Sequence, residues 1–280
     1  MRTIALLTDF GIRDIYVGVM KAVMTSIYPE VNLIDLSHYI SAQNVRSGAF
    51  ALLNAYAYFP KGTVFLVVID PGVGSLRQPV AIRCEDYFFV APDNGVLSYV
   101  LENYPTAEIV RIENPALQLP HKSNTFHGRD VFAPVAAHLA KDPAIFFDLG
   151  QPLDQWVTLP KPLLTIQQNR ILGEVIHTDH FGNVITSIYH FRWLASDQLK
   201  LELRWEQTPG TYTFDASEAI IKFADKELAG IHRAYHEVQR GDLMCQIDSN
   251  GFLEIAINQG NAQAYLDIKT GDRIELILPY

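Results

Sequence analysis

Residues 62–77, GTVFLVVIDPGVGSLR, contain the stretch that decides the fold. Six apolar residues, 64–69, run without interruption up to Asp70, and four of them are β-branched. A short continuous run of this kind predicts a strand that is covered on both faces, as in a parallel sheet. The run ends in a carboxylate and a Pro-Gly turn, and Arg77 follows seven residues after Asp70. Charged side chains at the end of such a strand are candidates for a ligand site.

The sequence on either side of this run alternates between strand and helix patterns. Short apolar runs at 3–11 and 31–38 predict two more strands, and apolar stripes at i, i+3/i+4 spacing predict helices at 17–29 and 45–60. This order is a βαβαβ unit, whose right-handed crossovers make a parallel sheet. Ligands collect at the carboxyl ends of the strands in such a sheet, and Asp9 lies at one of these ends, as Asp70 does.

The remaining patterns divide the chain into an α/β part and a β part. They predict a hairpin at 79–92, helices at 95–103 and 128–141, and a strand at 106–114. Three prolines interrupt 151–170, which we interpret as a linker, and short alternating strands follow it. We therefore expect an N-terminal three-layer α/β domain, residues 1–150, with a mainly parallel sheet. A smaller C-terminal antiparallel β-barrel domain is expected at 171–280.

Composition limits the class of protein. The 280 residues are 49% hydrophobic and 19% charged, which is typical of globular domains. The formal net charge of −9 argues against a nucleic-acid or membrane partner, because both need a basic surface. Cys84 and Cys245 lie far apart and are expected to be buried free thiols. The N-terminal apolar run is too short for a signal peptide, and no run of about 18 apolar residues follows, so we expect a cytoplasmic protein that binds a small molecule.

The motif DPGVGSLR at 70–77 has a structural interpretation beside the functional one. Pro at the second position and Gly at the third are typical of a type II turn. A dinucleotide-binding loop fits poorly, because Arg77 stands where its third glycine is required. DFG at 9–11 also occurs in protein kinases, but no catalytic-loop motif accompanies it here.

Other polar motifs also have structural interpretations. NTFHGRD at 124–130 places a histidine ahead of an expected helix, where histidine is often only a cap or a packing residue. DHFGN at 179–183 and DSNGF at 248–252 have the composition of hairpin turns. His232 and His236 have i, i+4 spacing, but the other ligands of a zinc motif are missing. We therefore expect a solvated helix face there and no metal site.

Together the motifs resemble one family. In chain order they are LLTDFG, VVIDPGVGSLR, APDNG, TFHGRD, FGN and SNGFLEIAIN, spread from residue 6 to residue 258. This series closely resembles that of the S-adenosyl-L-methionine (SAM) hydroxide adenosyltransferases, or SAM hydrolases. These enzymes are relatives of fluorinating and chlorinating enzymes that attack the same compound. The resemblance covers nearly the whole chain.

The resemblance implies that Asp70, Arg77 and His127 form a triad that holds the attacking water or hydroxide. Attack at the ribose 5′ carbon releases neutral methionine, so the leaving group needs no acid. A guanidinium and an imidazole can stabilise hydroxide, and a carboxylate can fix the guanidinium by a planar two-point contact. The expected products are adenosine and L-methionine, with SAM as the substrate, no resident cofactor and no metal.

Further family positions imply contacts to the rest of the ligand. The implied contacts are Asp9 to the ribose hydroxyls, Phe126 beside the reacting centre, Asp179 to the methionine ammonium, Asn183 and Asn258 around the adenine edge, Phe223 as a stacking surface, and Ser249 to the methionine carboxylate. Asn250 departs from the halogenating relatives, which have an arginine there. The family forms trimers whose sites lie between subunits, so we expect a homotrimer.

The resemblance favours a hydrolase over a halogenating enzyme. The halogenating relatives carry an aromatic residue where Asp70 stands, and a carboxylate there would repel a halide ion. Two alternatives stay open: a protein that binds SAM or adenosine without turnover, and a hydrolase of another adenosyl sulfonium compound, which Asn250 leaves possible. Residues 229–241 have no role assigned by the resemblance.

Overall fold

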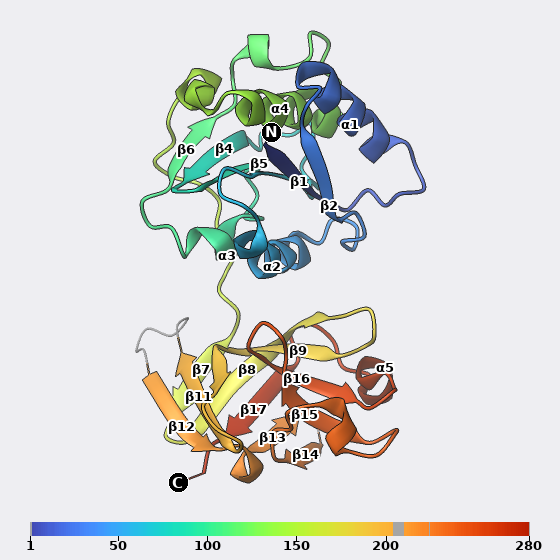
Figure 1. The fold of residues 1–280 in the computed structure, drawn as a ribbon, viewed down its shortest axis with the longest axis vertical. Coiled ribbons are helices and arrows are strands. Elements are labelled where there is room, and N and C mark those ends of the chain that lie inside the picture. The colour runs from blue at the N-terminus through green and yellow to red at the C-terminus, as the bar shows by residue number, and fades with distance from the viewer. Residues whose placement is uncertain (1, 204–209, 224, 280) are drawn as a thin grey trace. The chain divides into compact units, whose positions relative to one another are not determined.

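A computed structural model describes residues 2–203, 210–223 and 225–279. The chain divides into two compact units, Met1–Leu159 and Pro160–Tyr280 (Figure 1). The division falls within 151–170, the segment expected to be a linker. Among the described residues, no helix is both long enough and apolar enough to span a membrane.

The first unit is built on a six-stranded sheet with the order β2-β1-β3-β5-β4-β6. Its strands are β1 (Thr3–Thr8), β2 (Asn32–Ser37), β3 (Val64–Val68), β4 (Pro79–Cys84), β5 (Tyr87–Pro92) and β6 (Glu108–Arg111). β1 pairs in parallel with β2 and β3, and β3 pairs in parallel with β5. β4 is antiparallel to both of its neighbours. The expected mainly parallel sheet is confirmed.

Helices cover both faces of this sheet (Figure 1). α1 (Tyr16–Ile27) and α4 (Ala133–Lys141) lie on one face, and α2 (Val45–Ala55) and α3 (Ser98–Leu101) lie on the other. Alternate residues of β1 enter two separate cores: Ile4 and Leu6 pack with α1 and α4, and Ala5 and Leu7 pack with α2. β1 is therefore apolar throughout because both of its faces are buried, and the three-layer architecture is confirmed.

The helices expected at 128–141 and 95–103 are present, with local differences. The first begins as a π-helix, Gly128–Phe132, and continues as α4, and the second is shortened to the single turn α3. A type II turn at 70–73 would require a positive φ at Gly72, but the positive φ, 77°, is at Gly74 instead. A turn is formed at 70–73, since the Val73 N–H donates to the Asp70 carbonyl oxygen at 3.3 Å, but it is not of type II.

The second unit is mainly antiparallel. An eight-stranded sheet has the order β14-β13-β17-β8-β9-β16-β15, with β7 paired to β8, and β10-β11-β12 form a smaller sheet. The strands are β7 (Leu164–Gln167), β8 (Arg170–Thr178), β9 (Val184–Tyr189), β10 (Phe191–Trp193), β11 (Gln198–Leu203), β12 (Gly210–Asp215), β13 (Ile220–Phe223), β14 (Lys226–Ala229), β15 (Leu243–Ile247), β16 (Phe252–Ile257) and β17 (Arg273–Ile277). The larger sheet is nearly closed, which confirms the expected barrel-like domain.

Two minor expectations have opposite outcomes. Cys84 and Cys245 are buried free thiols, as expected, and burial raises the pKa of Cys84 to about 12. The expected helix around His232 and His236 is wrong, because His232 forms a bridge to Gln246 and His236 lies in a single 3₁₀ turn. Two histidines four residues apart lie on the same face when both belong to one α-helix. His232 and His236 do not belong to a common helix, so the expected helix face is not formed.

Candidate active site

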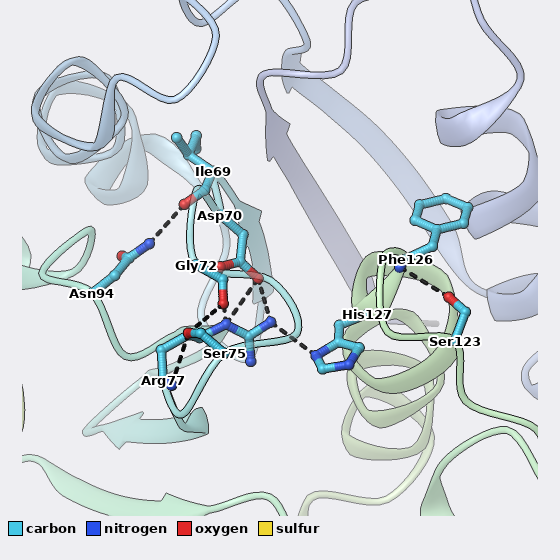
Figure 2. A network of polar contacts seen from close by, with 9 residues as sticks. All are labelled: Ile69, Asp70, Gly72, Ser75, Arg77, Asn94, Ser123, Phe126 and His127. Carbon is cyan, nitrogen blue, oxygen red and sulfur yellow. Dashed lines mark hydrogen bonds and ion pairs between the residues drawn. The ribbon is translucent and has the colours of Figure 1, made fainter.

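A buried carboxylate lies where β3 ends (Figure 2). Asp70 follows the strand, and its side chain is 4% exposed. The backbone before it is held by Asn94, whose Nδ2 donates to the carbonyl oxygen of Ile69 at 2.8 Å. Asn94 comes just after β5, the parallel neighbour of β3, so the carboxyl ends of the two strands meet here.

The Arg77 guanidinium binds both oxygens of this carboxylate. Its Nε donates to Oδ1 and Oδ2 of Asp70 at 2.9 Å each, and its Nη2 donates to Oδ2. The intervening loop turns back because Ser75 Oγ donates to the Gly72 carbonyl oxygen at 2.6 Å and accepts from the Arg77 N–H at 3.2 Å. The guanidinium carbon also lies 5.2 Å from the ring centre of Phe132. Carboxylate, turn and ring together fix one orientation of the guanidinium.

His127 joins this ion pair through one ring nitrogen (Figure 2). Arg77 Nη2 lies 2.9 Å from His127 Nδ1. Arginine can only donate, so Nδ1 accepts, and the hydrogen of the neutral imidazole is on Nε2. Burial, followed by the charge of Arg77, lowers the pKa of His127 below its ordinary 6.5. At pH 7 the imidazole is therefore neutral and has an N–H donor at Nε2.

Backbone packing places His127 beside Arg77. A Cβ added to Gly74 would lie 2.3 Å from the carbonyl oxygen of Asn124, so the two loops touch through their main chains. The positive φ of Gly74, 77°, also belongs to a region that L side chains rarely adopt. Glycine at this position therefore sets the distance between the Arg77 loop and the segment that leads to His127.

A buried aspartate holds the same segment from the other side. Asp130 is fully buried, accepts from the Ser123 N–H at 2.8 Å, and accepts from Arg129 Nε at 2.5 Å. Burial acts to raise the pKa of Asp130, but the hydrogen bonds from Arg129 and Ser123 outweigh it and lower the pKa. Asp130 therefore stays ionised and closes the loop 123–130.

Asp9 lies at the carboxyl end of β1, beside β3. Its Oδ2 accepts from the backbone N–H of Gln43 at 2.7 Å. The ring of the next residue, Phe10, lies 6.0 Å from the ring of Phe126, which in turn lies 5.1 Å from the ring of Tyr16. These aromatic contacts connect the end of β1 to the segment that carries the histidine. The structure thus brings Asp9, Phe126 and the three triad residues to one edge of the sheet.

The second unit contains a cavity of about 630 Å³, large enough for part of a small ligand. It is lined by Phe181, Asn183, Tyr235, Ile257, Asn258, Gln259, Gly260 and Asn261. Asp179 supports one wall: its Oδ1 accepts from the backbone N–H groups of Phe181 and Asn183, and its Oδ2 accepts from Asn183 Nδ2, all at 2.9 Å. Asp179, Asn183 and Asn258 are therefore brought together.

Two family models match most of the chain. The SAM hydroxide adenosyltransferase N-terminal domain matches residues 4–146, and the SAM hydroxide adenosyltransferase C-terminal domain matches residues 173–275. The chain belongs to the SAM hydroxide adenosyltransferase family. Each matched range lies within one of the two structural units.

Similar proteins cover this family member over nearly its whole length. A protein of Methanocaldococcus jannaschii named (R)-S-adenosyl-L-methionine hydrolase is 35% identical, covering 98% of this chain and 95% of its own. A protein of that name from Thermus thermophilus is 33% identical, covering 99% of this chain and 100% of its own. A fluorinase of Actinoplanes sp. is 28% identical, covering 96% of this chain and 95% of its own. The crystal structure of an uncharacterized conserved protein from Thermotoga maritima has a TM-score of 0.84 at 37% identity, covering 98% and 99%.

Two ligand contacts implied by the sequence of this adenosyltransferase lie outside the cavity lining. Phe223 is 2% exposed and lines a different cavity, of about 350 Å³. Ser249 is exposed in the turn between β15 and β16, which Asp248 closes by accepting from the N–H groups of Asn250 and Phe252 at 2.8 Å. Burial, and also the nearby carboxylate of Asp179, raise the pKa of Asp248 in this turn, so the turn that carries Ser249 lies on the side of Asp179.

Tyr235 lines the cavity but was not among the site residues predicted from the sequence. Tyr235 belongs to 229–241, the segment to which no role was assigned. Asn258 anchors this segment, because its Nδ2 donates to the carbonyl oxygen of Val238 at 2.9 Å and its carbonyl oxygen accepts from Gly241 N–H at 2.9 Å. An aromatic residue between DHFGN and SNGFLEIAIN was the available signal, but no periodicity marked it.

No metal cluster accompanies these groups in the residues that the structure of this family member describes. There, no three His, Cys, Asp or Glu side chains lie close enough together to hold a metal ion.

The His127 imidazole of this adenosyltransferase is expected to titrate below pH 6.5, its ordinary value. Because burial and Arg77 favour the neutral ring, its contribution to stability is complete above pH 6.5 and is lost as the pH falls below that value. Nitrogen–proton correlation spectra recorded across pH would give the midpoint and the tautomer, with the urea-unfolded chain as the reference. A midpoint at or above 6.5, or a neutral ring protonated at Nδ1, would contradict this assignment.

Proposed function

We propose that this protein hydrolyses S-adenosyl-L-methionine to adenosine and L-methionine by displacement at the ribose 5′ carbon. The observation that carries the proposal is the contact of Asp70, Arg77 and His127 at the end of β3. Family membership and the names of the full-length relatives give the substrate class. We further propose that SAM is a substrate here and that the chain has no resident cofactor.

The triad supplies donors for a hydroxide. Water gives its proton to solvent, the resulting hydroxide forms a bond to the 5′ carbon, and the carbon–sulfur electron pair leaves with neutral methionine. His127 does not act as a base through Nδ1, which already accepts from Arg77. Its Nε2–H and the remaining N–H groups of Arg77 instead stabilise the hydroxide before attack. Asp70 keeps the guanidinium in place and does not touch the reacting carbon.

The same ion pair favours water over halide as the nucleophile. Asp70 and Arg77 are 4% and 9% exposed, so their charges are only weakly screened by water. A halide must enter this position as an anion and is repelled by the Asp70 carboxylate, whereas water enters neutral and loses its proton only beside the donors of Arg77 and His127. The resulting hydroxide can use these donors and also form hydrogen bonds of its own. The proposed hydrolase differs in this respect from the relatives that are named fluorinases.

The cavity of the second unit is proposed to receive the nucleoside. Tyr235 presents a ring to it, so we assign the stacking role to Tyr235 instead of the buried Phe223. Asp9 remains the proposed partner of the ribose hydroxyls, and Asp179 of the methionine ammonium. Asp179 already accepts three N–H groups, so an ammonium would use its remaining lone pairs.

The test of the function is a product assay. The purified full-length chain, incubated with SAM, is expected to release adenosine and methionine in equal amounts, separated by chromatography. Addition of a chelator is expected to leave the rate unchanged, because the proposed chemistry uses N–H donors and no metal. Binding of SAM without products would favour the alternative of a binding protein, and strong inhibition by the chelator would overturn the proposed mechanism.

We also propose a homotrimer in which the first unit of one subunit and the second unit of its neighbour act on one ligand. The support is the resemblance to the family and the division of the proposed ligand contacts between the two units. Asp9, Asp70, Arg77 and His127 lie in the first, and Asp179, Asn183 and Asn258 in the second. Mass measurement under native conditions would test the oligomeric state.

Mixed trimers are expected to recover activity from two inactive variants. Asp70→Ala disables the first unit and Asp179→Ala disables the second, so each variant is inactive alone. Random refolding in equal amounts places an intact first unit with an intact second unit in about one quarter of sites shared by neighbours. The expected rate is therefore about one quarter of that of refolded wild type. No recovery in mixed trimers verified by mass would show that each site belongs to one subunit.

A further inference from the structure

Asn183 is held so that both of its amide hydrogens are occupied. Its Nδ2 donates to Asp179 Oδ2 at 2.9 Å and to the phenol oxygen of Tyr235 at 3.1 Å. A carboxylate only accepts, so the amide nitrogen, and not the amide oxygen, must face Asp179. The Asn183 side chain is 6% exposed and lines the cavity. What it has left for a ligand is its carbonyl oxygen.

The direction of the second hydrogen bond is also fixed. The Tyr235 hydroxyl donates to Glu254 Oε1 at 3.0 Å, and Gln246 Nε2 donates to the same oxygen at 2.6 Å. Because the phenol hydrogen is used on Glu254, the phenol oxygen is the acceptor for Asn183. Asp179 and Glu254 therefore lie at the two ends of a chain of hydrogen bonds. The two groups between them, the Asn183 amide and the Tyr235 phenol, each have one allowed orientation. Glu254 is 5% exposed, so water does not easily replace it.

We propose that Tyr235 and Glu254 are positioning residues that make this cavity selective for a purine with an exocyclic amino group over one with a carbonyl at that place. The inference rests on the proposed function, which brings adenosine to the cavity. An amino group can donate to the carbonyl oxygen of Asn183, whereas a carbonyl would place two acceptors face to face. A site built to bind one hydrogen-bonding group rejects an analogue that cannot complete the bond.

The test compares adenosine with inosine, which differ at this one group, by calorimetric titration of the full-length protein. Wild type is expected to bind adenosine far more tightly than inosine. Tyr235→Phe keeps the ring but frees one Asn183 hydrogen, so the ratio of the two dissociation constants is expected to fall about ten-fold. Tyr212→Phe, on β12 of the other sheet, is the matched control and is expected to keep the wild-type ratio.

Glu254 variants separate positioning from packing. Glu254→Gln still offers an oxygen to the phenol and is expected to keep the ratio, whereas Glu254→Leu removes the acceptor and is expected to lower the ratio as Tyr235→Phe does. If Glu254→Leu fails to fold, the ratios of the two dissociation constants in Tyr235→Phe and Glu254→Gln still test the inference. Equal losses for both nucleosides in Tyr235→Phe, with the ratio unchanged, would overturn the inference alone. A wild-type protein that binds neither nucleoside would overturn the proposed function with it.

Discussion

An Arg77→Lys variant is expected to lose about 100- to 1,000-fold in the rate of adenosine formation. A lysine keeps the charge, but its single nitrogen cannot make the contact with both oxygens of Asp70 and also donate to His127. Substrate affinity should change only a few-fold, because the proposed contact of the guanidinium is with the nucleophile and not with most of the ligand. Single-turnover rates measured beside calorimetric affinities would separate the two effects.

The matched control is Arg83→Lys on β4. Arg83 also pairs with a carboxylate, that of Glu108, and also lies over an aromatic ring, that of Phe146. This surface pair should contribute little, so the control is expected to keep the wild-type rate. Asp9→Ala should instead weaken binding, since the proposed contact of Asp9 with the ribose would exist before and during reaction. If Arg77→Lys retained the wild-type rate, the triad could not be what activates water.

A Gly74→Ala variant is expected to lose roughly 100-fold in rate, because a small displacement of catalytic groups is enough for a loss of that size. The new methyl group would meet the Asn124 carbonyl oxygen at 2.3 Å, and the loops could relieve this clash only by moving apart. Arg77 would then leave His127, and the pKa of His127 should move back toward 6.5. Reaction rates and the imidazole titration would be measured on the same sample.

Gly62→Ala is the control that separates the clash from backbone strain. Gly62 has a φ of 83°, close to the 77° of Gly74, but nothing lies within 4 Å of a Cβ built there. Both variants should lose about 1 kcal/mol of stability from the left-handed backbone. Only Gly74→Ala should change the rate and the titration. A comparable fall in rate for Gly62→Ala would mean that backbone strain, and not the spacing of the two loops, is responsible.

The first unit could be predicted because its strands are apolar on both faces. Uninterrupted runs that end in Asp9 and Asp70 gave both the parallel sheet and the edge where the polar groups gather. The π-helix at Gly128–Phe132 could not be predicted, because five residues are too few to distinguish its period from that of an α-helix. The contact of Gly74 with Asn124 depends on tertiary packing, which local pattern does not record.

The cavity of the second unit was harder to predict. In β13 burial alternates, so that Ile221 and Phe223 are buried. Tyr235 lies in a 3₁₀ turn, where no repeat shows which side chains face a ligand. Its orientation depends on Glu254 and Asn183, which are 19 and 52 residues away in sequence.

The division of the chain between Leu159 and Pro160 also separates two sets of hydrogen bonds. The hydrogen bonds that build the triad all join residues before this boundary, and those that orient Asn183 all join residues after it. With the roles proposed above, substitutions around Asp70 would change the nucleophile and leave purine recognition unchanged, whereas substitutions around Tyr235 would change the base that binds. The relatives of this chain include both proteins named (R)-S-adenosyl-L-methionine hydrolase and a protein named fluorinase.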